Sequence, residues 1–423
     1  MSIRSFAFAT FTGLSLAAGL IAHADSSGSA TLTAKVATDS NLFLMDDAPL
    51  AAGQTVASVP AEASAVVGSV ALNLGWKWTA SPRLALDLGY APERIHYRHY
   101  ASENHTDHRF SLAATGRTAD GHWLYDTKAA WLVTEGSEET PTFNRLGGSP
   151  ALGGEPVRSR RSQDVLKASG RLTRTLDHGF VRGAFALVRQ DFHTVESATP
   201  GCANYVDRGE WSVGPEAGWK LRPSLTLLSA VRAGRQTQAD LLGISENYSN
   251  TITRWLVGAE ATVSPTLKFN FLAGPDVRRF NRTVRAGFDR HVTTTYFEAS
   301  STWSPTRIDT VTLTGKQYLW FSGGGRGAYI DVVADLAWKH TFTAQWDFAA
   351  SANYHVGRTG ALNLKTPRDD IIPTLTATVG HALDAHTRLE AGFAYDWSIS
   401  RVPNTPAREY HRRIASLSCS RRW

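Results

Sequence analysis

Two acidic residues, Glu390 and Asp396, lie six positions apart in the segment "TRLEAGFAYDWSIS" (387–400). Two carboxyl groups can hydrolyse a glycoside together when they are roughly 5–9.5 Å apart. In this segment, however, apolar and polar residues alternate, and a period of two predicts a β-strand with both acids on one face. At about 3.3 Å per residue the acids would be about 20 Å apart. The segment therefore predicts a strand with a polar face rather than a catalytic pair.

Other candidate chemical sites are also weak. The segment "HYRHYASENHTDH" (96–108) contains four histidines that could bind a metal ion, but Tyr and Arg residues interrupt them and favour an exposed polar loop. The segment "SGGGRG" (322–327) resembles a phosphate-binding loop, yet no helix pattern follows it, so it predicts a plain loop. No Ser-His-acid spacing stands out. We expect no enzyme activity, no catalytic residue, no cofactor and no metal site.

Composition limits the remaining classes of function. The formal net charge is +6 and the charges are dispersed, which does not indicate nucleic-acid binding. The two cysteines, Cys202 and Cys419, are too far apart in the sequence to suggest a metal framework. A disulfide between them would require an oxidising compartment, and nothing in their spacing supports or excludes it.

The first 24 residues have the composition of a secretory signal peptide. Arg4 precedes an apolar stretch, and Ala22-His23-Ala24 supplies the small residues of a cleavage site. The apolar stretch is short for a retained membrane anchor, which is the alternative interpretation. We expect cleavage before Asp25 and a single mature domain over residues 25–423.

Alternation with a period of two continues along the whole mature chain and predicts an all-β fold. We count about 18 segments, with 16 as the alternative. They span residues 31–44, 64–80, 84–100, 108–119, 122–135, 161–177, 180–195, 207–222, 224–238, 250–264, 266–280, 291–304, 309–322, 327–342, 344–357, 370–384, 387–400 and 409–423.

The connections between these segments alternate in length. Every second connection is a tight turn rich in Pro, Gly, Asp and Ser, such as "ASPR", "ADG", "DHG" and "DAH". The others are longer and polar, including residues 45–63, 136–160 and 358–369. Short turns on one side and long loops on the other predict a transmembrane antiparallel β-barrel of the bacterial outer membrane, with short periplasmic turns. A soluble β-sandwich or propeller is the alternative, but those folds lack this strict alternation.

Two stretches resemble known outer-membrane proteins. The C-terminal "RIASLSCSRRW" resembles their recognition signal, which implies the barrel assembly machinery as a partner, although Arg421 departs from the usual residue type. The segment "KVATDSNLFLMDD" (35–47) resembles the first strand of the β-barrel porin 2 group, and "TWSPTRIDTVTLTGK" (302–316) resembles its hairpins. That group includes outer-membrane proteins of exopolysaccharide biosynthesis operons, so the resemblance implies a role beside saccharide export.

The polar set of each strand would face the lumen, whereas the apolar set would face the lipid bilayer. The predicted lumen-lining residues are Lys77, Asp126, Lys128, Arg171, Arg182, Glu216, Lys220, Arg254, Glu260, Glu298, Lys316, Asp331, Asp335, Lys339, Asp347, Arg388, Glu390 and Asp396. They could neutralise one another in cross-strand pairs or filter solutes by charge, and the two roles are compatible. A slight basic excess over the whole polar set favours anions or acidic saccharides.

A barrel of about 18 strands is wide enough for a water-filled lumen. We therefore expect a porin-like channel for small solutes or saccharides. If the resemblance extends to function, this channel would be the outer-membrane component of exopolysaccharide export. An outer-membrane enzyme or a structural or adhesion barrel with an occluded lumen is the alternative. The loop 136–160 runs from acidic to basic and resembles the constriction loop of general porins, or it is a plain extracellular loop.

Overall fold

The computed structural model describes residues 25–42, 64–81, 83–135, 162–193, 207–240, 246–280, 284, 287–321, 328–358, 369–401 and 410–423. Within these ranges the chain forms eighteen strands and one short 3₁₀ turn, η2 (Ala101–Glu103). The strands are β1 (Asp25–Asp39), β2 (Ala65–Ser81), β3 (Leu84–Tyr97), β4 (His105–Arg117), β5 (Trp123–Thr134), β6 (Gln163–Leu176), β7 (Gly179–Phe192), β8 (Arg208–Arg222), β9 (Leu225–Gln238), β10 (Asn250–Ser264), β11 (Leu267–Phe280), β12 (His291–Trp303), β13 (Asp309–Phe321), β14 (Ala328–Thr341), β15 (Trp346–Arg358), β16 (Asp369–Ala382), β17 (Thr387–Arg401) and β18 (Tyr410–Arg422).

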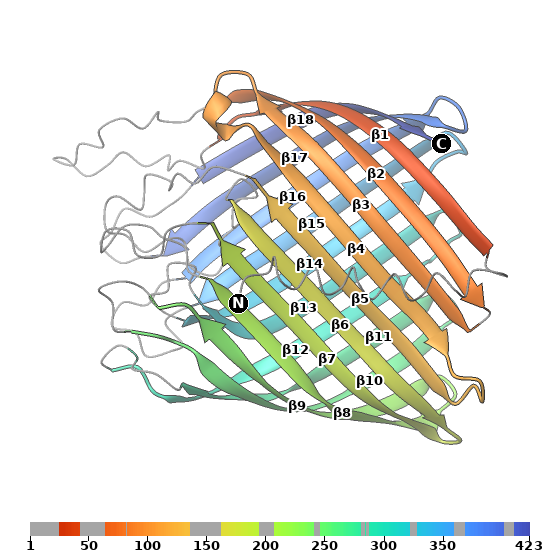
Figure 1. Ribbon diagram of the computed structural model, residues 1–423, viewed down its shortest axis with the longest axis vertical. Helices are drawn as coiled ribbons and strands as arrows, with labels where there is room; N and C mark the ends of the chain where they lie inside the picture. Colours follow the sequence, from red (N-terminus) through yellow and green to blue (C-terminus); the bar gives the residue numbers. More distant parts are fainter. Residues whose placement is uncertain are drawn as a thin grey trace.

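The strands form one closed antiparallel sheet. Each strand pairs with the next one along the chain, and β1 pairs with both β2 and β18, so that the first and last strands lie side by side (Figure 1). The predicted transmembrane β-barrel of 18 strands is therefore confirmed, and the alternative of 16 strands is wrong. A closed sheet satisfies its backbone hydrogen bonds internally, which a bilayer demands of any segment that crosses it.

The first strand begins earlier than its sequence pattern predicts. The predicted segment was 31–44, whereas β1 starts at Asp25 and pairs with β2 from Asp25↔Thr79 onwards. Residues 25–30, "DSSGSA", contain no large apolar side chain, so they carry no alternation to detect. Their strand conformation follows from their neighbour β2, which runs on to Ser81.

The connections alternate in length, as predicted. The strand bounds leave tight turns at 82–83, 118–122, 177–178, 223–224, 265–266, 304–308, 342–345 and 383–386. In the turn at 118–122, Gly121 has a φ of 74°, a conformation that glycine adopts without strain. The long connections emerge at the opposite end of the barrel, where the strands β1, β3, β5 and their odd-numbered successors end.

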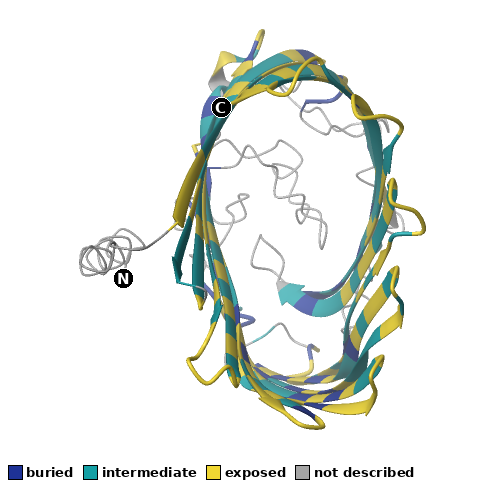
Figure 2. Cartoon of the chain, turned by 90° about the vertical axis from the view of Figure 1, so that its right-hand side faces the viewer, coloured by how far each residue is buried: buried dark blue, intermediate teal, exposed yellow. Residues whose placement is uncertain are grey.

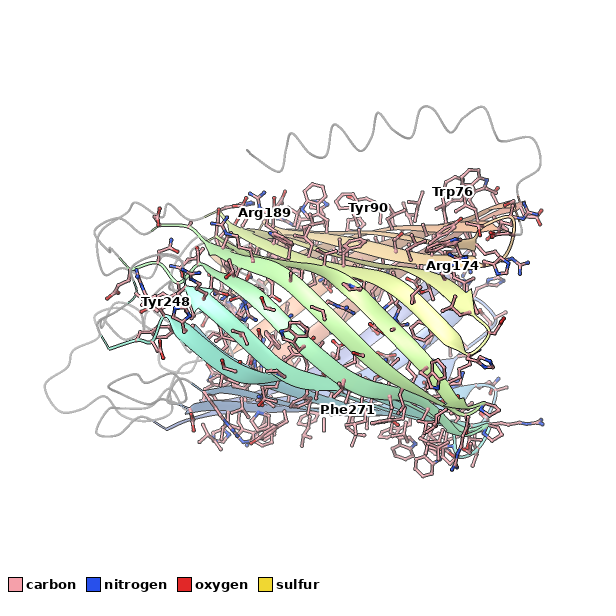
Figure 3. The ribbon with its side chains drawn as sticks, turned by 90° about the horizontal axis from the view of Figure 1, so that it is seen from below. Trp76, Tyr90, Arg174, Arg189, Tyr248 and Phe271 are labelled. Carbon is pink, nitrogen blue, oxygen red and sulfur yellow. The ribbon has the colours of Figure 1, made fainter. Side chains whose placement is uncertain are left out.

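The outer face of the barrel is apolar. Large hydrophobic side chains are exposed all the way round, with Trp219 63 %, Val257 66 % and Leu417 62 % accessible. Figure 3 shows Trp76, Tyr90 and Phe271 pointing away from the barrel. Such a continuous apolar belt would be unstable in water and matches the hydrocarbon core of a bilayer. Among the described residues, no helix is long and apolar enough to cross a membrane.

Several predictions fall on residues outside the described ranges. These are the signal peptide 1–24, the long loop 136–160, the glycine-rich loop 322–327 and Cys202. They stay predictions. Cys419, in contrast, lies in β18 as a free and exposed cysteine.

Candidate functional site: the inner face of the barrel

The strand register determines which side chains share a face, because residues opposite one another in an antiparallel pair point the same way. From strand to strand the pairing joins polar residues to polar ones, for example Asp126↔Arg171, Arg182↔Glu216 and Glu298↔Lys316. Most of the exposed Leu, Val and Trp side chains hold the alternate positions, with the inward Leu124 as an exception. The register thus places all of the predicted lumen residues on the inner face: Lys77, Asp126, Lys128, Arg171, Arg182, Glu216, Lys220, Arg254, Glu260, Glu298, Lys316, Asp331, Asp335, Lys339, Asp347, Arg388, Glu390 and Asp396.

A buried ionic network, here called the distal cluster, joins β8, β10 and β11 in the half of the barrel near the long loops. Arg254 lies 3.0 Å from the Glu210 carboxylate and 3.1 Å from that of Asp276. Arg278 lies 2.7 Å from Asp276 and donates a hydrogen bond of 3.1 Å to Asn250. Two cations therefore face two anions, and the network is neutral. Each charge has an opposite charge within reach, which offsets the cost of its burial inside the wall.

A second network, the proximal cluster, lies nearer the tight turns. The Arg182 guanidinium contacts Glu216, and lies 2.7 Å from Glu260. Arg232 lies 2.6 Å from the other oxygen of Glu216, whose side chain is fully buried. The strands β7 and β9 thus share one central carboxylate on β8, and Glu260 of β10 joins the cluster through Arg182. This cluster is also neutral, with two arginines against two glutamates.

The predicted set contained Arg254, Arg182, Glu216 and Glu260, but it omitted the buried pair Asp276 and Arg278. Both lie at polar alternate positions of β11, in "GPDVRRF" (274–280), so period two alone could have placed them on the inner face. Their burial could not be anticipated, because it depends on which strands and loops cover them.

On the opposite wall, ion pairs are more open to solvent. Arg388 lies 2.7 Å from Asp347 and 3.6 Å from Glu390. Asp335 accepts hydrogen bonds from Asn353 and Thr314, and Asp331 contacts His355. Gly392 and Ala394 occupy the inward positions between Glu390 and Asp396, so these two acids belong to separate contacts along the strand.

The inner face of β4 to β6 carries a row of four cations without ion pairs in the described ranges, whereas Arg109 of β4 is paired with Glu93 and Asp107. Lys167, Lys128, Arg171 and Arg117 follow one another from the long-loop end to the turn end, and all four side chains are exposed. Within the described part of the chain, none of the four has a carboxylate within 4.0 Å, although Asp126 faces Arg171 in the register. We call these four residues the basic ladder. Lys167 and Arg117 occupy polar alternate positions of their strands, so the alternation that places Lys128 and Arg171 on the inner face predicts the same face for these two.

The run that carries the porin-group resemblance has a structural role. Asp39 accepts hydrogen bonds of 2.6 and 3.0 Å from Arg412 of β18, and Asn41 donates one of 3.2 Å to the carbonyl of His411. Ser40 and Arg413 bond to each other through their backbones at 3.0 Å. Asp39, Asn41 and Leu42 are buried. This contact, here called the closure clasp, fastens β1 to β18 where the barrel closes.

The histidines of segment 96–108 do not converge. His105 is buried on the inner face, with Nδ1 2.7 Å from the Glu103 carbonyl oxygen, whereas His108 contacts Tyr90, which points outward. In the described part of the chain, no three His, Cys, Asp or Glu side chains are arranged to hold a metal ion.

No protein-family model matches the sequence, and no curated protein matches it either. Solved structures resemble it in shape. OccK2 (OpdF) of Pseudomonas aeruginosa is 12 % identical with a TM-score of 0.43, and the match covers 93 % of this chain and 98 % of that one. The outer membrane protein OpdK of Pseudomonas aeruginosa is 10 % identical with a TM-score of 0.43, covering 94 % and 99 %. An anion-selective porin from Comamonas acidovorans is 10 % identical with a TM-score of 0.38, covering 95 % and 100 %.

The assignment of the fold rests on the chain's own strand pairing and on its apolar outer belt. An even number of antiparallel strands, closed into a barrel with an apolar exterior and a polar interior, is the architecture of bacterial outer-membrane proteins. The chain is therefore an 18-stranded transmembrane β-barrel of the bacterial outer membrane.

Proposed function

We propose that this barrel is an outer-membrane channel for small polar solutes, and that it favours anions. The observation that carries the preference is the basic ladder, whose four cations are exposed on the inner face without ion-pair partners among the described residues. The distal and proximal clusters on the neighbouring wall neutralise themselves. The basic ladder therefore adds positive charge to the interior that no ion pair among the described residues offsets, and the exposed inward Lys220, Lys268 and Lys339 add to it on other strands.

Charge in this arrangement acts on passing ions. A wall that carries one sign of charge, next to low-dielectric protein and lipid, raises the local concentration of counter-ions. Rings or rows of Lys and Arg favour anions in pores for the same reason. Anions would therefore enter and cross this barrel more readily than cations of the same size.

The experiment is a reversal-potential measurement in planar bilayers with a KCl gradient. The wild-type channel is expected to select chloride over potassium. A variant with Lys128→Gln, Lys167→Gln and Arg171→Gln should conduct, with a permeability ratio shifted toward cations. Arg174→Gln is the matched control, because Arg174 lies on the same strand as Arg171 but on the outer face (Figure 3).

Acidic saccharides are the more specific solute class that we propose, on the basis of the basic ladder and the resemblance of residues 35–47 to the exopolysaccharide-associated group. Liposome swelling can compare a uronic acid with the neutral sugar of the same size. Faster swelling with the uronic acid would support this class, and equal rates would restrict the proposal to small solutes in general. A folded wild-type barrel without conductance would instead favour the occluded enzyme or structural barrel.

A further inference from the structure

The barrel wall contains one place where two neighbouring strands separate. β12 and β13 pair only from Trp303↔Val311 to Phe297↔Gln317, although both strands continue for several residues toward the long loops. β12 remains paired with β11 up to His291, and β13 remains paired with β14 up to Phe321. The separation is therefore a seam in an otherwise continuous sheet, with regular strands on both sides.

Beyond the seam, residues 318–321 of β13, here called the β13 tip, leave the wall and lie inside the barrel. The side chain of Gln236 on β9 donates a hydrogen bond of 2.9 Å to the carbonyl oxygen of Leu319. The guanidinium of Arg208 on β8 lies 5.6 Å from the centre of the Trp320 ring. The tip thus reaches across the inner face of β10 to β12, and Figure 2 shows a strand end turned from the wall into the interior.

The packing of Leu319 shows that the wall overlaps itself at the seam. Leu319 occupies an outward position of β13, in line with the exposed Leu313, yet it is fully buried. It packs against Tyr248, Phe280 and Phe288, of which Phe280 is an inward residue of β11. The outer side of the tip therefore rests on the inner side of the neighbouring wall.

The sequence of the tip also suits a position in the wall. Leu319 continues the outward positions of Val311 and Leu313, and Tyr318 continues the inward position of Lys316. The last observed pair of β12 and β13 is Phe297↔Gln317. If the same register continued toward the long loops, Leu319 would face Thr295. In the observed arrangement the carbonyl oxygen of Thr295 instead accepts a hydrogen bond of 2.8 Å from the Gln317 side chain. An unpaired strand edge with a matching partner segment is a site for strand pairing.

We propose that the β13 tip is a gate of this channel, which rests on the proposed channel function. In the docked state that the structure shows, the tip occupies the extracellular half of the interior and narrows it. In the open state the tip pairs with β12, closes the seam and leaves the interior free. Gln236 is the latch of the docked state, because its amide bonds both the tip and Glu210 of the distal cluster, at 2.9 and 2.5 Å.

The two states exchange similar kinds of interactions, which is what a two-state element requires. Docking buries Leu319 and satisfies its carbonyl oxygen, whereas wall pairing restores the backbone hydrogen bonds of β12 and places Leu319 toward the lipid. The distal cluster stays in the wall in both states and keeps its internal ion pairs. Opening would expose this cluster to the water of the lumen.

The test is a cross-strand disulfide that captures the open state. Thr295→Cys with Leu319→Cys, in a background with Cys202→Ser and Cys419→Ser, should form a disulfide on oxidation only if the tip reaches β12. Ser301→Cys with Leu313→Cys is the matched control, since these two outward residues already face each other in the wall. Ser301 lies an even number of residues from Thr295 along β12, so both cysteine pairs would be of the same type in the antiparallel ladder. Gel mobility reports the cross-link independently of conductance.

Both pairs are expected to cross-link, and oxidation of the Thr295/Leu319 pair alone should raise single-channel conductance, reversibly with reductant. Absence of that cross-link while the control pair forms, or a cross-link without any change in conductance, would overturn the gate. If the wild-type barrel never conducts, the proposed function fails, and the gel still shows whether the tip moves.

A second variant tests the latch without a disulfide. Gln236→Ala removes the hydrogen bond to Leu319 and should increase the fraction of time that the channel spends in its high-conductance state. Gln163→Ala is the control, since Gln163 is a buried inward glutamine whose side chain, within the described ranges, accepts a hydrogen bond of 2.7 Å from Gln190 on the neighbouring strand and none from the β13 tip. Equal gating in Gln236→Ala and wild type would overturn the role of the latch.

Discussion

Charged residues on the inner face of this barrel fall into two groups that differ in their partners. Glu216 and Asp276 have side chains with no accessible surface, and each is held by two arginines. Lys128 and Lys167 are exposed and have no carboxylate in range among the described residues. The charges of the first group hold strands of the wall together. Those of the second group are available to the solutes that we propose the channel carries.

Substitution of single residues on opposite faces of β17 tests the assignment of faces. Phe393 is 49 % exposed on the outer face, so Phe393→Arg puts a charge into lipid and should destabilise the barrel by about 2–4 kcal/mol. Glu390→Ala, on the inner face, should fold with little change. The measurement is the free energy of unfolding from lipid vesicles in guanidinium. A large loss for Glu390→Ala with none for Phe393→Arg would invert the faces.

The turn between β16 and β17 predicts a pH dependence. Asp384 accepts hydrogen bonds from the backbone amides of His386 and Thr387, at 2.6 and 2.7 Å, and these hold the pKa of its carboxyl below its usual value. A carboxyl whose pKa is lower in the folded state stabilises that state above its unfolded pKa, near 4. This stabilisation is lost as the pH falls through the lowered folded pKa.

Asp384→Ala should therefore lower the unfolding midpoint at neutral pH and leave it unchanged relative to wild type at strongly acidic pH. Thermal unfolding in detergent at a series of pH values measures the difference between the two proteins. A difference that does not depend on pH would show that the carboxylate charge plays no part in the turn.

At the scale of strands, the distal cluster holds β8, β10 and β11 together through side chains as well as backbone pairing. Arg254→Met would leave the two carboxylates Glu210 and Asp276 with one arginine, Arg278, in a buried site. Removal of one partner from a buried ionic network typically costs roughly 3–5 kcal/mol. Unfolding of the variant in guanidinium measures this cost.

Arg388→Met is the comparison, because the Arg388–Asp347 pair is partly exposed and contributes about 1 kcal/mol or less. Similar losses for Arg254→Met and Arg388→Met would mean that burial does not distinguish the two networks.

Period-two alternation was sufficient to predict most strand positions and faces. The predicted segments 224–238, 250–264 and 387–400 lie within a residue or so of β9, β10 and β17. The alternation could not predict which charges pair. Arg182 and Glu260, for example, are 78 residues apart and meet only through the register of four strands. The seam between β12 and β13 was also invisible, since the β13 tip alternates like any wall strand. Whether the inward charges line an open pore stays a prediction.

At the scale of the whole molecule, the alternation of connection lengths defines its orientation in the membrane. The tight turns should face the periplasm and the long loops the cell exterior. In a background with Cys202→Ser and Cys419→Ser, His99→Cys in the β3–β4 connection should react with a membrane-impermeant maleimide on intact cells. His386→Cys in the β16–β17 turn should react only after the outer membrane is opened. The reverse pattern would mean that the barrel is inserted the other way.

The closure clasp has a consequence for how the barrel can be assembled. Asp39 and Arg412 are separated by 373 positions, so the contact can form only when both ends of the chain are present at the same edge. Without β18 the sheet would have seventeen strands, and in a meander of odd number the first and last strands run in the same direction. Antiparallel pairing of β1 with β17 would then be geometrically impossible. Completion of the last strand is therefore the event that converts an open sheet with two reactive edges into a sealed cylinder, and a chain shortened by that one strand could close only by pairing its first and last strands in parallel.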